Sequence, residues 1–556
     1  MPPSGAGAVV AHASPTNADG DAGGTGRTAS SIPPLYPCDP AATILLMSNA
    51  TVIVDRDFVI DSVSPRLFGS FVEHLGRGVY GGIYEPGHPT ADRNGFRQDV
   101  LSLIRELGVT VVRYPGGNFV SNYRWEDGVG PKDKRPCRRE LAWVTTETNQ
   151  MGTDEFIDWC RLAGIEPMLA VNLGTRGPAE AADYYEYCNH PSGTALADLR
   201  RSNGHDKPHD VRLWCMGNEA DGPWQMGQKP AAAYGSQARE AAKLMYLPDT
   251  NRSASNILKP EFIACGSASR SMPTYGKWDQ EVLEQCFDKV DYLSVHSYVS
   301  PNNQDTASFL AFSDVTMAPL IREITAICDA VAARRKSAKR IHLSYDEWNV
   351  WSGNGEKPYP AWAIAPDQLQ DVYTLADALC VGTMLITLLN HCDRVKIACL
   401  AQLVNVIAPI MTRTGGPAWR QTIFYPFEAA SRLGRGVVLR QVCDTPTYKV
   451  NDQSVGLLTS AVVQNADGGL TVFAVNRDLE KPLSLTLDMR SFPRMQVVDW
   501  TVLDGDLKAT NTEDTPDRVQ PRPCHSDVAA GHRITMQLPK ASWNVIHLHP
   551  PLGNQE

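Results

Sequence analysis

The chain has 556 residues, of which 43% are hydrophobic and 21% charged, a composition typical of a globular protein with more than one domain. Its net charge of −10, with no basic stripe, excludes a surface built to bind nucleic acid. The longest uncharged apolar stretch, residues 378–389, is too short to span a bilayer, so we expect a buried helix there and no membrane segment.

The first 44 residues are rich in Gly, Ala, Ser and Pro and show no apolar periodicity. Such a segment buries too little apolar surface to offset the entropy of ordering it, so residues 1–44 are expected to form a disordered tail. They also lack the charged and then apolar pattern of a secretory signal. Thr51–Val54 indicate a first strand, in a segment (45–62) that we expect to join a C-terminal sandwich domain.

Between residues 63 and 428, strand-like apolar runs alternate with helical patterns. Gln98–Leu107 and Thr153–Ala163 have apolar residues at helical spacing, and a glycine follows each of them. Apolar strands that alternate with amphipathic helices indicate a parallel sheet buried on both faces, and eight such units predict a (β/α)₈ (TIM) barrel. The eight strand candidates are Arg66–Glu73, Val109–Tyr114, Pro167–Leu173, Val211–Asn218, Phe262–Gly266, Tyr292–Ser297, Ile341–Glu347 and Val395–Gln402.

The pattern changes at about residue 429. Leu483–Leu487 alternates strictly between apolar and polar residues, and turn-forming residues such as those at 465–469 separate further strand-like runs. Residues 429–556 are therefore predicted to form an antiparallel β-sandwich of jelly-roll type. The predicted fold class is α/β, a TIM barrel with this additional β-sandwich.

Two glutamates, Glu219 and Glu347, each follow a short apolar run and have an aromatic residue and an asparagine nearby. A carboxylate at the end of a buried strand is costly unless it is paired or functional. The C-terminal strand ends of a barrel face the ligand, and by our count Glu219 ends strand four and Glu347 ends strand seven. A facing pair of acids is the arrangement that cleaves glycosidic bonds.

Other polar and aromatic residues are expected near the same strand ends. Each of them alone has an ordinary structural explanation: His296 could be a core histidine, and Arg113 could be an ion-pair partner. Their convergence on two acids instead predicts a sugar pocket, with Trp143, Trp348 and Trp351 as a stacking wall. The remaining residues of this set are Glu73, Asn118, Tyr298 and Gln402.

The thirteen cysteines are scattered, odd in number and without a C-x-x-C pair or a cluster with histidines. This usage favours a reducing compartment, and we expect a cytoplasmic protein without disulfides. The chain has no Walker sequence, no H-E-x-x-H and no G-x-S-x-G in a triad context. Neither a metal nor an organic cofactor is expected.

Several stretches carry a more specific resemblance. The chain resembles the α-L-arabinofuranosidases of glycoside hydrolase family 51, which are retaining enzymes of a barrel clan. The likeness extends over nearly everything after residue 45. The matching stretches are Phe71–Arg77, Tyr114–Phe119, Met216–Trp224, Tyr345–Trp351 and Ala401–Pro409.

The resemblance implies roles for individual residues. Glu219 would be the general acid/base and Glu347 the nucleophile, about 5 to 5.5 Å apart as retention requires. Asn218 would bind the sugar 2-hydroxyl. The implied supporting residues are Tyr298 and Arg113, which would orient and ionise the nucleophile, Glu73, Asn118 and Gln402, which would bind furanose hydroxyls, and Trp351, which would contact substrate.

The implied activity is exo-acting hydrolysis, with retention, of terminal α-L-arabinofuranosyl residues from arabinan- or arabinoxylan-derived oligosaccharides. The expected partners are such arabinose-containing oligosaccharides or polysaccharides, and a homo-oligomer, often a hexamer in this family. Two alternatives keep the same residues: a related barrel glycosidase such as a β-xylosidase or endoglucanase, and a carbohydrate-binding protein that has lost catalysis. The linkage preference, 1,2, 1,3 or 1,5, is left open.

Overall fold

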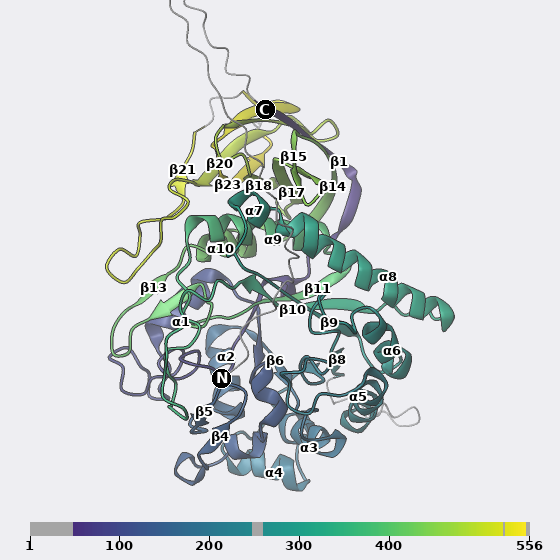
Figure 1. Ribbon diagram of the computed structural model, residues 1–556, viewed down its shortest axis with the longest axis vertical. Helices are drawn as coiled ribbons and strands as arrows, with labels where there is room; N and C mark the ends of the chain where they lie inside the picture. Colours follow the sequence, from purple (N-terminus) through teal and green to yellow (C-terminus); the bar gives the residue numbers. More distant parts are fainter. Residues whose placement is uncertain (1–47, 247–258, 526–528, 552–556) are drawn as a thin grey trace, which may run out of the picture. The chain divides into compact units, whose positions relative to one another are not determined.

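The structure is a computed structural model that describes residues 48–246, 259–525 and 529–551 (Figure 1). The predicted tail at residues 1–44 lies outside the described residues. Within the described ranges, no helix combines the length and the apolar character that crossing a bilayer would need.

Eight parallel strands close into a barrel in the order β10-β11-β2-β3-β6-β7-β8-β9. Each of them falls on one of the eight predicted runs, so the barrel prediction is confirmed. The strands are β2 (Gly69–Phe71), β3 (Val111–Tyr114), β6 (Glu166–Ala170), β7 (Leu213–Cys215), β8 (Glu261–Ala264), β9 (Tyr292–Val299), β10 (His342–Val350) and β11 (Val395–Leu400).

The two helices predicted with their ends finish where the sequence indicated. The predicted helices are present as α1 (Gln98–Leu107) and α2 (Thr153–Ala163), and Gly108 and Gly164 cap them in the left-handed conformation, at φ 77° and 75°. The other helices are α3 (Pro178–Asn189), α4 (Ala195–Ser202), α5 (Ala231–Met245), α6 (Lys277–Cys286), α7 (Thr306–Leu310), α8 (Ala318–Arg334), α9 (Leu375–Asn390) and α10 (Phe424–Leu433).

The structure corrects several strand ends. Strand four (β7) ends at Cys215, because Gly217 and Glu219 have positive φ angles of 94° and 38° that interrupt the ladder, so Glu219 lies in the following loop. Strand seven (β10) continues past Glu347, and strand six (β9) includes both His296 and Tyr298. Strands six and seven pair with each other up to Val299 and Val350, which explains their greater length.

The second domain is one nine-stranded sheet in the order β21-β20-β23-β18-β17-β14-β1-β19-β22. Its inward side chains form an apolar cluster that includes Val52, Leu485 and Ile546. The strands are β1 (Ser48–Ser62), β14 (Val437–Asp444), β17 (Leu458–Gln464), β18 (Leu470–Asn476), β19 (Leu483–Asp488), β20 (Gln496–Leu503), β21 (Arg522–Pro523), β22 (Arg533–Leu538) and β23 (Ser542–His549).

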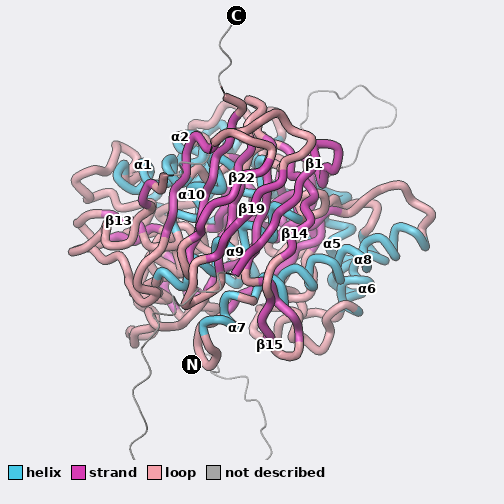
Figure 2. Tube along the Cα trace, turned by 90° about the horizontal axis from the view of Figure 1, so that it is seen from above, coloured by secondary structure: helices cyan, strands magenta, loops and turns pink. Residues whose placement is uncertain are grey.

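Strand β1 joins this sheet, as expected for the segment before the barrel. It lies between β14 and β19, and Figure 2 shows these strands side by side with β22. The pairing with β14 is antiparallel but that with β19 is parallel, so the sheet is mostly and not wholly antiparallel.

The barrel was expected to end at residue 428, but helix α10 continues through this position to Leu433. We therefore propose the domain boundary at residues 434–436, between α10 and β14.

Helix α9 joins the two domains. It contacts β10 of the barrel on one side and β17 and β18 of the sandwich on the other. This explains why the apolar stretch at 378–389 is apolar all round, since a helix covered on every face has no polar side. A Cβ on Gly382 of α9 would lie 2.6 Å from the Trp543 ring, so only glycine allows β23 to approach this closely.

Candidate active site

The two predicted acids face each other. One side-chain oxygen of Glu219, one of Glu347 and a ring nitrogen of His296 all lie within 4.8 Å of one another. Retaining glycosidases hold their two carboxyl groups about 5 to 5.5 Å apart, whereas inverting enzymes leave about 6.5 to 9.5 Å for a water molecule. The separation therefore fits direct attack by one carboxylate on a sugar held between them.

A β-bulge in β10 aims Glu347 at this site. Successive side chains of a regular strand point to opposite faces, so Asp346 and Glu347 would be expected to diverge. The register between β10 and β9 shifts between Ser344 and Glu347, which brings Glu347 opposite His296. Such a bulge redirects a side chain, and both Asp346 and Glu347 consequently approach the His296 ring.

Both oxygens of Glu347 are bound by donors. Arg113 Nη1 donates to Oε1 over 2.6 Å, and the Tyr298 hydroxyl donates to Oε2 over 2.8 Å. The other terminal nitrogen of Arg113 donates to Asn218 Oδ1 over 2.6 Å, and Asn218 Nδ2 donates to Asn118 Oδ1 over 3.3 Å. Charge-assisted bonds of this kind favour the carboxylate form that a nucleophile needs.

Glu219 sits on a tight turn and is bound from two sides. The N–H of Gly222 donates to the Glu219 carbonyl over 2.8 Å and closes the turn. His296 Nδ1 lies 2.9 Å from Oε1 of Glu219, and the Trp224 indole N–H donates to Oε2 over 2.7 Å. The acid is thus oriented through both of its oxygens.

His296 is held as a cation. Burial acts to lower the pKa of its ring, but Glu347, Asp346 and Glu219 outweigh burial and raise the pKa to about 10. Its Nε2 lies 3.0 Å from Asp346 Oδ1. Burial also acts to raise the pKa of Asp346, yet Arg113 and His296 hold it below its ordinary value. Both nitrogens of the ring therefore act as donors to carboxylates.

The cluster of Glu219, His296 and Glu347 is compact enough to share a cation, since its donor atoms lie within 4.8 Å of one another. A metal requires a neutral imidazole, because the nitrogen lone pair makes the bond. His296 is protonated here, and Arg113 already neutralises Glu347. The donor set suits proton transfer better than metal binding.

Glu73 forms a second group beside the acids. Its Oε1 accepts from the backbone N–H groups of Gly117 and Phe119 (3.0 and 2.9 Å) and from the Trp143 indole (3.2 Å). Gln402 Nε2 donates to Oε2 over 3.2 Å. Burial, with a smaller contribution from Glu347, raises the pKa of Glu73 to about 8, although the Phe119 N–H acts to lower it.

The predicted tryptophan wall is only partly present. Trp143 lies in the hairpin of β4 (Arg138–Glu140) and β5 (Thr145–Glu147) and contacts Glu73. The Trp351 ring meets the Tyr298 ring edge to face at 5.5 Å. Trp348, by contrast, is fully buried in the barrel core and cannot face a sugar. It follows Glu347 on β10 and points the other way.

Comparisons with known proteins agree with this geometry. Two family models match, the α-L-arabinofuranosidase 1 domain over residues 103–310 and the α-L-arabinofuranosidase C-terminal domain over residues 346–542. An intracellular exo-α-(1→5)-L-arabinofuranosidase of Halalkalibacterium halodurans is 51% identical over 507 residues, covering 90% of this chain and 99% of that protein. An exo-α-(1→6)-L-arabinofuranosidase of Bifidobacterium longum is 47% identical, and the match covers 90% of this chain and 98% of that protein.

Solved structures agree as well. The structure of a family 51 α-L-arabinofuranosidase from Bifidobacterium longum superimposes with a TM-score of 0.85 at 44% identity, covering 90% of this chain and 100% of that one. The chain belongs to the α-L-arabinofuranosidases of glycoside hydrolase family 51. It is accordingly a glycoside hydrolase, and the resemblance drawn from its motifs is confirmed.

Three residues of this candidate site were not predicted from the sequence. Asp346 was overlooked because it neighbours Glu347 on a strand, and Trp224 because only the turn at 219–222 brings it to the acid. Gly117 is the third: a Cβ there would lie 2.9 Å from Glu347 Oε1. Its place in a Gly-Gly pair one residue beyond a strand was a signal of close approach to the site.

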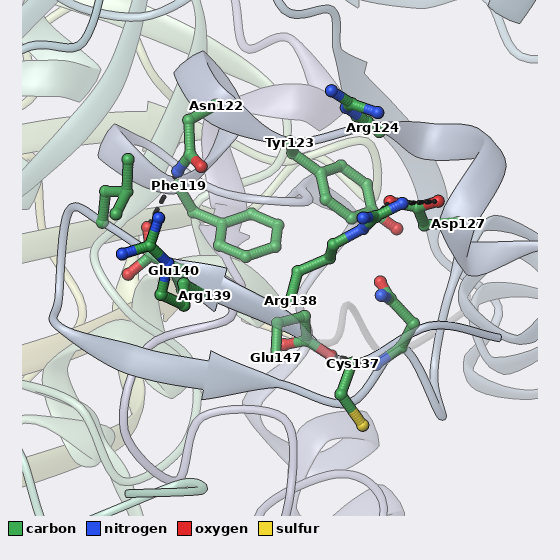
Figure 3. A pocket seen from close by; sticks show the side chains of 12 residues that line it. Phe119, Asn122, Tyr123, Arg124, Asp127, Cys137, Arg138, Arg139, Glu140 and Glu147 are labelled. Carbon is green, nitrogen blue, oxygen red and sulfur yellow. Dashed lines mark hydrogen bonds and ion pairs between the residues drawn. The ribbon is translucent and has the colours of Figure 1, made fainter. Parts of the chain in front are cut away.

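A cavity of about 430 Å³ flanks the candidate site without including either acid (Figure 3). Phe119, Asn122 and Glu140 line it, together with Arg138, which pairs with Asp127 over 2.9 Å. Glu140 accepts from Asn122 Nδ2 over 3.1 Å and from the Trp143 backbone N–H over 2.6 Å. The wall of this cavity therefore also fixes the loop that carries Trp143 to Glu73.

Proposed function

We propose that this chain is a retaining, exo-acting α-L-arabinofuranosidase in which Glu347 is the nucleophile and Glu219 the general acid/base. One observation carries the assignment: the two carboxylates lie within 4.8 Å, and of the two acids it is Glu347 that Arg113 and Tyr298 bind. Arg113 cannot lose its proton, so it is a permanent charged partner for Glu347. The cation beside Glu219 is instead the titratable ring of His296, and no arginine or lysine is among the hydrogen-bond partners of Glu219 in the described ranges.

In the first step, Glu347 attacks the anomeric carbon of a bound arabinofuranosyl group. The bond from this carbon to the leaving oxygen breaks, and Glu219 gives that oxygen a proton. Asn218, which Arg113 holds in place, and Asn118, which Asn218 binds, are available for sugar hydroxyls. Glu73 and Gln402 are available as well. The product of this step is an ester between the sugar and Glu347.

In the second step, water replaces the leaving group. Glu347 is now neutral, so Glu219 can remain ionised and take a proton from the water as it attacks the anomeric carbon. The ester bond breaks and Glu347 departs as a carboxylate. Two inversions give net retention. The imidazolium of His296, between the two acids, stabilises whichever of them carries charge.

We infer that the substrates are arabinose-containing oligosaccharides or polysaccharides such as arabinan and arabinoxylan fragments. The names of the relatives support the sugar but not one linkage, because one is called a (1→5) and another a (1→6) enzyme. Assays on a panel of linkage-defined disaccharides would settle the preference. The alternatives of β-xylosidase and endoglucanase predict faster turnover of aryl β-xyloside or of cello-oligosaccharides.

The assignment of the two acids is tested by azide rescue on an activated aryl α-L-arabinofuranoside. With Glu219→Ala, azide should accelerate turnover and give the arabinosyl azide of retained configuration. With Glu347→Ala, it should give the inverted azide. Labelling by a cyclophellitol-type furanoside, followed by peptide mapping, should mark Glu347. Label on another residue would reject the assignment.

We also propose an intracellular location and a homo-oligomer, for example a hexamer. The first is supported by the word intracellular in the names of relatives and by the cysteines of the described residues, which are all free and mostly buried. The second comes from the family resemblance. Light scattering on the purified chain would test it.

A further inference from the structure

A larger cavity opens at the face of the barrel opposite the two acids. Its volume is about 750 Å³, and its walls come from the starts of β8, β9 and β10 and from the residue just before β7. Parallel strands place their starts at one face of a barrel and their ends at the other, so this cavity is separate from the candidate active site. Its volume lies within the range of about 300 to 1,000 Å³ that is typical of small-molecule sites.

Positive charge gathers on the wall of this cavity, although the chain carries a net charge of −10. Among the described residues that line it, lysines and arginines outnumber carboxylates by five to three. The cations are Arg212, Lys259, Lys289, Lys339 and Arg340, and the carboxylates are Glu261, Asp288 and Asp291. Within the described part of the chain, Lys259, Lys289 and Arg340 have no carboxylate partner.

The three carboxylates are already bound by other groups. Arg66, which is not part of the wall, donates to Glu261 over 2.8 Å. Arg335, which also lies outside it, donates to Asp288 over 3.2 Å, and Asp291 accepts from a backbone N–H over 2.9 Å. The acids therefore neutralise little of the positive charge on the cavity wall.

Helix ends explain only part of this charge. Helices α5, α6 and α8 lead into β8, β9 and β10, so they end near this face, and the partial negative charge of a helix C-terminus attracts cations. Lys339 meets such an end, because its Nζ donates over 3.0 Å to the carbonyl of Phe287, the C-cap of α6. Lys289 is half-buried and Arg340 exposed, and neither side chain donates a hydrogen bond to another described residue. Both cations keep their donors for a ligand.

His342, at the start of β10, lies in the positive potential of this wall. Burial lowers the pKa of its ring, and the charges of three neighbouring cations, Arg340 among them, lower it further, although Asp61 acts in the opposite direction. Nδ1 of the ring is buried and has no hydrogen-bond partner among the described residues. An anion in the cavity would offset the repulsion between these groups.

We propose that this cavity is a binding site for a small phosphorylated metabolite, with the phosphate held by Lys289, Lys339 and Arg340. A phosphate monoester carries about 1.5 to 2 negative charges near pH 7, and its oxygens accept hydrogen bonds, which matches a wall of unpaired donors. The cavity also leaves room for the sugar that carries the phosphate, beside the ring of Tyr246. The site does not depend on the proposed reaction.

Calorimetric titration of the full chain with ribose 5-phosphate tests the site. We expect saturable binding with a Kd below about 1 mM, and a melting temperature that rises with the concentration of this ligand, because a ligand that binds the folded state stabilises it. Ribose at the same concentration and sodium chloride at the same ionic strength should produce neither effect. An equal response to ribose would point to a sugar site, and an equal response to sodium chloride would point to charge screening. Either result would overturn the proposal.

Two variants locate the bound phosphate. Lys289→Met and Arg340→Met should each weaken the binding of ribose 5-phosphate about tenfold or more, the effect of losing one charge-assisted hydrogen bond. Their kcat/KM on para-nitrophenyl α-L-arabinofuranoside without this ligand should equal that of the wild type, which shows that both variants fold. Arg440→Met is the matched control: Arg440 is exposed on β14, has no carboxylate partner in the described ranges, and should bind the ligand as the wild type does when replaced.

An unchanged Kd in both cavity variants would overturn the proposal, as would competitive inhibition of the arabinofuranosidase assay, which would place ribose 5-phosphate in the active site. Light scattering provides a further check. A smaller oligomer in either variant, together with no phosphate binding by the wild type, would assign the cations to a contact between subunits. A wild-type chain that binds the ligand but cleaves no arabinofuranoside would reject the proposed function and leave this site standing.

Discussion

Nε2 of His296 lies 3.0 Å from Oδ1 of Asp346, a carboxylate that is completely buried in the barrel. The opposite ring nitrogen, Nδ1, lies 2.9 Å from Glu219 and 3.7 Å from Glu347. The ring therefore connects a charge inside the barrel to both acids at its mouth. Asp346 acts at a distance, through the position and protonation of His296.

Asp346→Asn should weaken this connection. The pKa of His296 is about 10, above its ordinary value of 6.5, so the protonated ring stabilises the fold fully below about pH 6.5 and this contribution is lost as pH rises through about 10. Without the Asp346 charge, the loss should begin at lower pH. Removing one partner of a buried pair costs about 3 kcal/mol or more. Thermal unfolding between about pH 6 and pH 10 measures the loss of stability and its pH dependence. The constant kcat/KM over the same range measures the effect on activity.

Ser344→Ala provides the matched control. The Ser344 hydroxyl donates to Asp346 Oδ2 over 3.1 Å, so this variant removes a hydrogen bond and leaves every charge in place. It should cost about 1 kcal/mol without moving the pH dependence. A pH profile of Asp346→Asn that superimposes on that of Ser344→Ala would contradict the role of Asp346.

Glu73→Gln should reveal a second titration. The pKa of Glu73 is raised to about 8 from an ordinary 4.5, so its contribution to stability is greatest below about pH 4.5 and is lost as pH rises through about 8. Glutamine does not titrate. The melting temperature of the variant minus that of the wild type should therefore rise across this window and level off above it. Melting curves of both proteins in the same buffers measure this difference, and a flat difference would contradict the shifted pKa.

Gly117→Ala should damage catalysis more than folding. The backbone at Gly117 has φ −86° and ψ −95°, and the new methyl would lie 2.9 Å from Glu347 Oε1 and 3.4 Å from Asn218 Nδ2. We expect kcat/KM to fall about a hundredfold, since small displacements of reacting groups have effects of that size. Gly87→Ala is the control, because no heavy atom lies within 4 Å of its Cβ, and it should leave kcat/KM unchanged. Equal activities of the two variants would refute the steric argument.

The parts of the molecule that the sequence predicted are those decided by local pattern. Apolar runs and helical spacing depend on neighbours along the chain, so the eight barrel strands and the helices that end at Gly108 and Gly164 were found. The acid pair was found for a related reason: parallel strands bring their C-terminal ends to one face, whatever the sequence distance between them.

The parts that were missed depend on pairing between distant segments. Alternation along β10 places Asp346 and Glu347 on opposite faces, and only the register shift against β9 brings both to His296. The end of β7 was placed too late because the positive φ angles at Gly217 and Glu219 are set by the turn that follows. Trp348 was assigned to the sugar wall by composition, whereas its position on β10 directs it into the core.

Arg66 offers a prediction at the opposite face of the barrel, where the strands begin. Its guanidinium binds Glu166 through two hydrogen bonds of 2.6 and 2.7 Å and Glu261 through one of 2.8 Å, joining the starts of β6 and β8 to the segment before β2. Arg66→Met should destabilise the protein by about 1 to 2 kcal/mol, because these partly exposed charges are screened by solvent.

Because the two proposed catalytic acids lie at the C-terminal strand ends, kcat and KM of Arg66→Met should stay at the wild-type values, and chemical denaturation with parallel kinetics measures both properties. Arg212→Met is the matched control. Arg212 is 3.9 Å from the same Glu261 and half exposed, so its loss should leave stability nearly unchanged. A fall in kcat for Arg66→Met without a fall in stability would mean that the two faces of the barrel are coupled, contrary to this division between a stabilising face and a catalytic one.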